Sequence, residues 1–168
     1  GLGDVYKRQG IDFSMFWQGV AKRDLWLDGP MFWGISGGEW QSTGLKEHLD
    51  YYRPENTTSV FGPNTNAYFP KMYMSKDMNQ KVQTRYLQNG AYARLKNIQL
   101  GYTFPTQIIN KLHMQKLRVY VSAENVLTIT SLPSGFDPET TYSNYSDGNS
   151  GKTYPLQTTI SFGLNATF

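Results

Sequence analysis

The chain has 168 residues, a net charge of +3 at pH 7, 39% hydrophobic residues, 17% charged residues and no cysteine. The lack of cysteine excludes a disulfide framework and a thiolate metal site, and no apolar run is long enough for a membrane helix. A small charge spread along the chain does not favour a nucleic-acid partner, and 12 Tyr, 9 Phe and 4 Trp are too many aromatic residues for a disordered chain. This aromatic-rich, charge-poor mixture favours β-structure with one face in water.

Residues 1–9 share no pattern with the rest of the chain. They have neither the basic region nor the apolar region of a signal peptide. The segment resembles a translated adapter tag at the edge of an assembled sequence fragment. We therefore predict a non-native or truncated start at residues 1–9, followed by the natural sequence from residue 10 to residue 168. The alternative for this segment is an ordinary loop.

Four stretches alternate apolar and polar residues with a period of two, which is typical of strands with one apolar and one polar face. We predict strands at about 11–27, 91–104, 116–130 and 154–168. In the last stretch, even positions are apolar except for one threonine, whereas odd positions carry polar residues or glycine. In the second stretch the apolar phase slips near Lys96, which indicates a β-bulge.

The predicted strands are too long for an ordinary globular domain, since globular strands usually have about 5–6 residues. At about 3.3 Å per residue and a tilt near 45°, fourteen residues span roughly 33 Å along a membrane normal. Aromatic residues also gather near the strand ends, as in the interfacial girdles of membrane barrels. The pattern favours a membrane barrel, and a long antiparallel sheet in a soluble protein is the alternative.

The connections between the strands differ in length. A short one, with a helical turn near residues 108–112, joins the second and third strands, whereas long loops cover about 28–83 and 131–153. Short turns of outer-membrane barrels face the periplasm and long loops face outside, so we expect extracellular long loops and a periplasmic C-terminus.

Aromatic residues are frequent in the first long loop and make a binding surface plausible. Such side chains stack on sugar rings or hold peptide side chains, although packing within the loop is the better explanation for any single one of them. The candidate substrate contacts are Trp33, Trp40, Tyr51, Tyr52 and Tyr73.

The sequence gives little sign of catalysis. Residues 34–38 fit the G-x-S-x-G spacing of a hydrolase nucleophile elbow, but that motif needs a strand before it and a helix after it. His48 and His113 lie far apart in the sequence, which disfavours a histidine metal site. We expect no catalytic residue, no metal and no cofactor.

Several motifs in a specific order point to a family. They lie at residues 16–20, 85–102, 117–127, 135–139 and 154–168. In this order they resemble the C-terminal region of SusC/RagA-type TonB-dependent transporters of Bacteroidota. The resemblance implies an all-β fold: the C-terminal antiparallel strands of a large transmembrane β-barrel of about 22 strands, incomplete as given because a four-stranded sheet leaves two open edges.

The resemblance also implies a function. Such a barrel is an active importer of glycans, oligosaccharides or peptides in the outer membrane, surrounded by lipid and without enzymatic activity. A SusD-like surface lipoprotein would cap it, and TonB would act through a plug region that this sequence lacks. Phe168 matches the terminal signal that the barrel-assembly machinery reads. A passive porin-type barrel and a soluble carbohydrate-binding β-domain are the alternatives.

Overall fold

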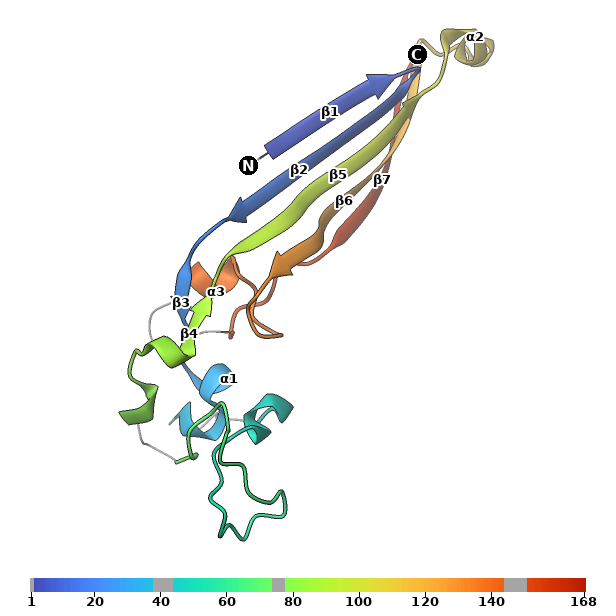
Figure 1. Ribbon diagram of the computed structural model, residues 1–168. Coiled ribbons are helices and arrows are strands. Elements are labelled where there is room, and N and C mark those ends of the chain that lie inside the picture. Colours follow the sequence, from blue (N-terminus) through green and yellow to red (C-terminus); the bar gives the residue numbers. More distant parts are fainter. Residues whose placement is uncertain (1, 38–43, 74–77, 144–150) are drawn as a thin grey trace. The chain divides into compact units, whose positions relative to one another are not determined.

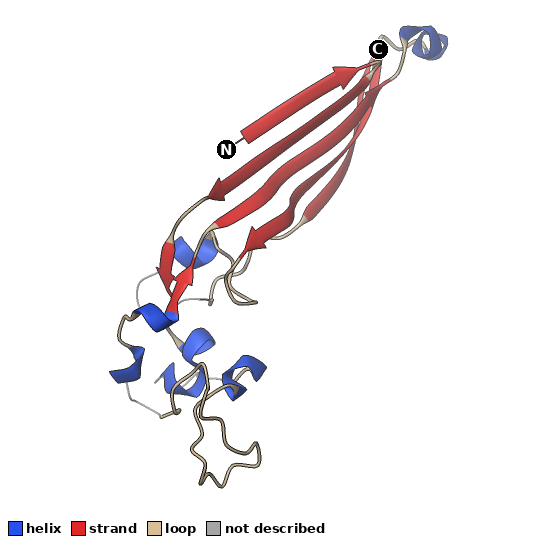
Figure 2. Cartoon of the chain, viewed as in Figure 1, coloured by secondary structure: helices blue, strands red, loops and turns tan. Residues whose placement is uncertain are grey.

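The computed structural model describes residues 2–37, 44–73, 78–143 and 151–168. The chain divides into two compact units. The first contains residues 1–23, 90–131 and 156–168, and the second contains residues 24–89 and 132–155. Long strands make up the first unit, whereas short helices and loops make up most of the second (Figures 1 and 2).

The first unit is one antiparallel sheet with the strand order β1-β2-β5-β6-β7. Its strands are β1 (Leu2–Arg8), β2 (Ile11–Val20), β5 (Tyr92–Thr103), β6 (Lys116–Thr130) and β7 (Thr159–Thr167). β5 and β6 have 12 and 15 residues, well above the roughly 5–6 residues of a common globular strand. The predicted all-β fold with long antiparallel strands is thus confirmed.

The short connections lie at one end of the sheet, where the C-terminus also lies (Figure 1). Gln9 and Gly10 join β1 to β2 with positive φ angles of 49° and 82°, as in a two-residue hairpin turn. The helix α2 (Thr106–Ile109) and the 3-10 turn η5 (Asn110–Leu112) join β5 to β6. This connection confirms the helical turn that the sequence predicts there.

The predicted β-bulge at Lys96 is confirmed. Between the same two rungs of the ladder, β2 has one residue (16), β5 has two (96 and 97) and β6 has three (124 to 126). The two rungs are Met15–Ile98–Ala123 and Trp17–Leu95–Leu127. The extra residues let the strands diverge while the side chains of both rungs stay on the same face.

Asn125 lies in the bulged part of β6 and has a positive φ of 52°. Its side-chain amide donates to the carbonyl of Gln157 at 3.1 Å, and its own carbonyl accepts from the hydroxyl of Thr158 at 2.9 Å. Regular pairing between β6 and β7 begins only at Glu124 and Thr159. The closing strand therefore starts later than the alternation predicts, because the bulge replaces ladder bonds with side-chain bonds.

β2 ends at Val20, although the alternation predicts a strand to about residue 27. Leu25, Trp26 and Leu27 are 2%, 7% and 0% exposed and belong to the core of the second unit. Part of this segment forms the short strand β3 (Asp24–Trp26), which pairs with β4 (Leu87–Asn89). Three consecutive buried side chains cannot lie on one face of a strand, so the one-sided sheet cannot continue through them.

β1 pairs with β2 over its full length of seven residues, but its side chains do not follow the pattern of the sheet. Asp4 lies opposite Met15 and Arg8 lies opposite Ile11, so two charged residues fall on the face that carries apolar side chains. The pairing shows that the edge of β2 accepts a further strand. The non-native origin of residues 1–9 stays a prediction.

The second unit is built from short elements around an aromatic core. Its helical turns are α1 (Pro30–Trp33), η1 (Gly34–Gly37), η2 (Lys46–Leu49), η3 (Met78–Gln80), η4 (Thr84–Tyr86) and α3 (Thr140–Ser143). The buried core consists of Leu25, Trp26, Leu27, Phe32, Trp33, Phe69, Tyr86, Leu132 and Phe136. Trp33 and Tyr86 meet edge to face at 4.9 Å, and burial raises the pKa of the Tyr86 phenol.

A buried arginine also orders the long connection. Arg53 is 8% exposed, and its guanidinium donates to the carbonyls of Gly62 at 2.6 Å and Leu49 at 2.7 Å. These bonds satisfy backbone acceptors that have no strand partner.

Among the helices that the structure describes, none is long and apolar enough to cross a membrane.

Candidate functional site: a two-faced sheet and an aromatic loop unit

One face of the sheet is apolar and exposed. The register places three apolar rows across β2, β5, β6 and β7: Ile11–Tyr102–Val119–Leu164, Phe13–Leu100–Val121–Phe162 and Met15–Ile98–Ala123–Ile160. In these rows Leu100, Leu164 and Phe162 are 50%, 64% and 85% exposed. Soluble monomers rarely expose a contiguous apolar surface of this kind, so this face requires apolar surroundings.

The opposite face of the sheet is polar. Two of its rows are Asp12–Gly101–Tyr120–Gly163 and Ser14–Gln99–Ser122–Ser161. Arg94 extends this face beyond the bulge, where its Nε donates to the hydroxyl of Thr128 at 2.8 Å. A sheet with these two faces separates an apolar phase from a hydrated one.

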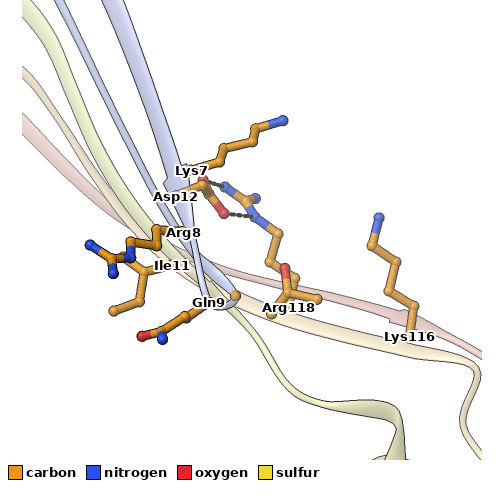
Figure 3. A pocket seen from close by; sticks show the side chains of 9 residues that line it. Lys7, Arg8, Gln9, Ile11, Asp12, Lys116 and Arg118 are labelled. Carbon is orange, nitrogen blue, oxygen red and sulfur yellow. Dashed lines mark hydrogen bonds and ion pairs between the residues drawn. The ribbon is translucent and has the colours of Figure 1, made fainter.

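An ion pair crosses the polar face from β2 to β6 (Figure 3). Nε and Nη2 of Arg118 donate to the two carboxylate oxygens of Asp12 at 2.9 and 2.5 Å. β5 runs between these strands, and Gly101 is the β5 residue that pairs with Asp12. A Cβ at Gly101 would lie 2.5–2.7 Å from Arg118 Nη2 and the Asp12 carboxylate, so glycine leaves the room that this bidentate pair needs.

Tyr120 continues this arrangement toward β7. The guanidinium of Arg118 lies 4.8 Å from the centre of the Tyr120 ring, which is within cation–π distance. The same ring covers Gly163, its pairing partner on β7, where a Cβ would overlap ring atoms. Two glycines thus seat a continuous Asp–Arg–Tyr group across the polar face.

The alternation of apolar and polar residues puts Arg118 on the polar face of β6, but it gives no sign of the ion pair. The two partners are 106 residues apart, and only the strand order brings them together. The useful signal was a glycine in each polar phase of β5 and β7, at positions 101 and 163, because a strand glycine often marks close approach of another group.

The structure places the predicted substrate contacts in different surroundings. Trp33 is 2% exposed and packs in the core of the second unit. Tyr51 is half-buried against that core, whereas Tyr52 and Tyr73 are 41% and 46% exposed. Trp40 lies outside the described residues. Exposure alone does not show that any of these residues contacts a substrate, so the set stays a prediction. The exposed rings of Tyr52 and Tyr73 are the members best placed for such a contact.

The surroundings of the serine motif and of His48 indicate roles in holding the loop. Residues 34–37 form η1 directly after helix α1 rather than after a strand, and Gly38 lies outside the described residues. The backbone N–H of Leu45 donates to Nδ1 of His48 at 2.9 Å, and Nε2 of His48 donates to the carbonyl of Phe32 at 3.1 Å. Within residues 2–37, 44–73, 78–143 and 151–168, no three histidine or acidic side chains lie close enough to hold a metal ion.

Strand length and the two faces define a class of protein. The 15 residues of β6 would span roughly 35 Å at the usual 45° tilt, which matches a hydrocarbon core of about 30 Å with its interfaces. The sheet is a segment of a transmembrane β-barrel wall with a polar interior. It is not closed, because β1 and β7 each have a free edge.

Comparison with known sequences agrees with this class. Protein-family models give no match. TonB-dependent receptor P3 of Formosa agariphila is 36% identical over 112 residues, which are 62% of this chain and 11% of the relative. TonB-dependent receptor P26 of the same organism is 25% identical over 174 aligned residues, covering 100% of this chain and 16% of the relative. The chain thus spans only a small part of these relatives.

Comparison with solved structures supports the same fold. The chain resembles part of the RagAB peptide transporter with a TM-score of 0.65 and 24% identity, over 95% of this chain and 16% of that one. The open-open state of the RagAB peptide importer gives a TM-score of 0.59. The chain is thus similar in sequence to part of TonB-dependent receptors, and its fold resembles a wall segment of the RagAB transporter.

We expect Gly101→Val to weaken the sheet, because the added Cβ displaces the Asp12–Arg118 ion pair. The expected loss in the free energy of unfolding is about 1–3 kcal/mol, the range for an overpacked site and for a lost hydrogen bond to a charged group. Denaturant unfolding of the complete barrel in detergent measures it. The cost should largely vanish in an Asp12→Ala background, and an equal cost for Ser161→Val on the same face would contradict the interpretation.

We expect Leu164→Arg to destabilise the barrel by about 2–4 kcal/mol if the residue lies near the bilayer midplane, and by less nearer an interface. The reason is that Leu164 lies on the exposed apolar face, where an arginine would meet hydrocarbon. Folding into lipid vesicles at graded denaturant concentrations measures the change. Ser161→Arg on the polar face is the matched control, and equal losses for both variants would show that the faces are wrongly assigned.

Proposed function

We propose that this chain forms C-terminal strands and outer loops of an active importer in a Gram-negative outer membrane. The observation that carries the proposal is the sheet with one apolar and one polar face, which matches a segment of the RagAB transporter over 95% of the chain. Similarity to TonB-dependent receptors favours energised import over passive permeation. The proposed substrates are glycans, oligosaccharides or peptides, and RagAB is itself a peptide transporter.

The proposed orientation places the C-terminus in the periplasm and the loops at about 28–83 and 131–153 outside the cell. Its support is that the short connections and the C-terminus lie at one end of the sheet (Figure 1), since short turns of such barrels face the periplasm. In this arrangement residues 10–168 are barrel, and residues 1–9 occupy an edge that another wall strand would cover.

Each part of the chain has a distinct task in this proposal, and none involves covalent chemistry. The apolar rows contact lipid, while the polar face with its Asp12–Arg118 pair lines the hydrated lumen. The ion pair ties β2 to β6 across β5 and stiffens the wall beside the transport path. The second unit supplies the outer surface that meets the substrate, including the exposed rings of Tyr52 and Tyr73.

The proposed partners follow from the family. A SusD-like lipoprotein would act as a lid on the extracellular side, and TonB would pull on a plug that lies outside this chain. The barrel-assembly machinery would insert the protein into the membrane. Similarity to TonB-dependent receptors and to the RagAB assembly supports these partners.

The test of the proposed function is uptake by cells that carry the complete gene. Fluorescent peptides and oligosaccharides of equal length are offered to cells with and without TonB. We expect accumulation of one substrate class that disappears when TonB is deleted. Accumulation that continues without TonB would instead identify a passive porin-type barrel, and a purified protein that stays monomeric without detergent would identify a soluble domain.

Deletion of Phe168 tests the proposed assembly signal. Phe168 is 77% exposed at the end of β7, so its loss removes few contacts within the sheet. We expect clearly lower levels of the full-length protein in the outer membrane, measured by surface labelling. Phe168→Tyr keeps a terminal aromatic ring and serves as the control. Normal surface levels after the deletion would remove the assembly role.

A further inference from the structure

The second unit contains a cavity of about 500 Å³, a size typical of small-ligand sites. Its apolar wall is formed by Met31, Phe32, Phe69 and Phe136, and its polar side includes Glu47 and Asp50. These six residues come from segments that are distant in sequence but belong to the same compact unit. An apolar wall with a few polar groups on one side is the usual composition of a binding pocket.

The apolar wall has a shape that disfavours a sugar ring. The ring of Phe32 meets those of Phe69 and Phe136 at centroid distances of 5.6 and 6.3 Å, both in edge-to-face geometry. The three rings are only 4–9% exposed, so little of their flat surface is open for a sugar to stack on. Tyr68, which also lines the cavity, is 36% exposed and meets Phe69 edge to face at 4.9 Å. Rings packed in this way suit an aliphatic or small aromatic side chain better than a stacked sugar.

The charge of the cavity has one sign. Glu47 and Asp50 are acidic, and no lysine or arginine is among the described residues that line the cavity. His48 also lines it, but its Nδ1 bonds to the Leu45 N–H and its Nε2 bonds to the Phe32 carbonyl, so both ring nitrogens already have partners. The cavity therefore favours a cationic group over an anionic or neutral one.

The two carboxylates differ in their availability. One oxygen of Asp50 accepts from Nδ2 of Asn64 at 2.8 Å, and the other accepts from the backbone N–H of Tyr68 at 3.2 Å. The carboxylate of Glu47 is exposed and has no hydrogen-bond or ion-pair partner in the part of the chain that the structure describes. Asp50 thus fixes the loop, whereas Glu47 is free to receive a ligand.

We infer that this cavity binds a peptide through a cationic amino group and the apolar side chain next to it. The amino group, from a lysine or a peptide N-terminus, pairs with Glu47, and the apolar side chain contacts Met31 and the three phenylalanine rings. Ser134 and Gln88 also line the cavity. The hydroxyl of Ser134 can bond to the peptide backbone, and so can the amide oxygen of Gln88, whose Nε2 already donates to Tyr68 and Tyr86. The inference rests on the proposed import function and narrows its substrate to basic peptides.

Binding to the purified, complete transporter tests the inference. The probes are an N-terminally acetylated hexapeptide with adjacent phenylalanine and lysine, the same peptide with its lysine also acetylated, and a neutral oligosaccharide of six glucose units. We expect the lysine peptide to bind about tenfold more tightly than its acetylated form, as for one charge-assisted contact. Glu47→Gln should remove most of this preference, and Glu55→Gln, an exposed carboxylate away from the cavity, should keep it.

A steric variant provides a second, independent measurement. Ser134 is exposed at the mouth of the cavity, so Ser134→Trp fills the cavity without a change in the aromatic core. We expect it to abolish binding of the lysine peptide while the protein keeps its unfolding midpoint. Peptide binding that is unchanged in both Glu47→Gln and Ser134→Trp would overturn the inference, as would tighter binding of the oligosaccharide than of either peptide.

Uptake in cells separates this inference from the proposed function. If TonB-dependent uptake is unchanged by Glu47→Gln and by Ser134→Trp, the import function is supported and the proposed peptide site is rejected. Peptide binding that depends on Glu47, without any TonB-dependent uptake of the probes, would keep the cavity and remove the import function.

Discussion

Hydrocarbon offers no hydrogen-bond partner to a backbone N–H or C=O, and the rest of the wall follows from this constraint. Each inner strand of the sheet pairs on both sides, so its backbone is satisfied without water. The ladder must extend through the whole apolar layer, which accounts for strands of up to 15 residues. The same constraint applies to the two open edges of the sheet, which cannot face lipid unless further strands pair with them.

In a sheet of this kind, the apolar and polar faces stay separate only if side chains alternate strictly along each strand. The bulge preserves this separation. An extra residue in a strand would normally move every later side chain to the other face. Here β5 and β6 gain different numbers of residues between the same rungs, yet Leu95 and Leu127 stay on the face of Ile98 and Ala123. The polar Asn125 in this region bonds to the chain that leads into β7, which explains a polar residue within an apolar phase.

Local alternation predicted the parts of the fold that depend on local pattern. The long strands, the bulge at Lys96 and the short helical connection all follow from the spacing of apolar residues along the chain. The end of β2 did not follow, because Leu25 and Leu27 continue the apolar phase of the strand and yet are buried, together with Trp26, in another unit. Tertiary burial outweighs a short periodic signal.

The ion pair shows a second limit of local pattern. Asp12 and Arg118 read only as polar positions of two strands, and their contact depends on the order of strands in the sheet. For the same reason Trp33 could be identified as a noteworthy aromatic residue but not as a core residue. The rings of Phe69 and Tyr86, which pack against Trp33, come from residues far from it in the sequence.

The described residues of the second unit show why a long connection of this kind is folded. Its cavity shares Phe32, Phe69 and Phe136 with the hydrophobic core, so the wall that would meet a ligand is held by the same packing that folds the unit. Arg53 fixes the adjoining backbone through carbonyls that no strand would satisfy. A ligand therefore meets a surface that is already ordered, and little of its binding free energy is lost in ordering the loop. Selectivity at such a site then depends on charge and shape rather than on closure of the loop around each ligand.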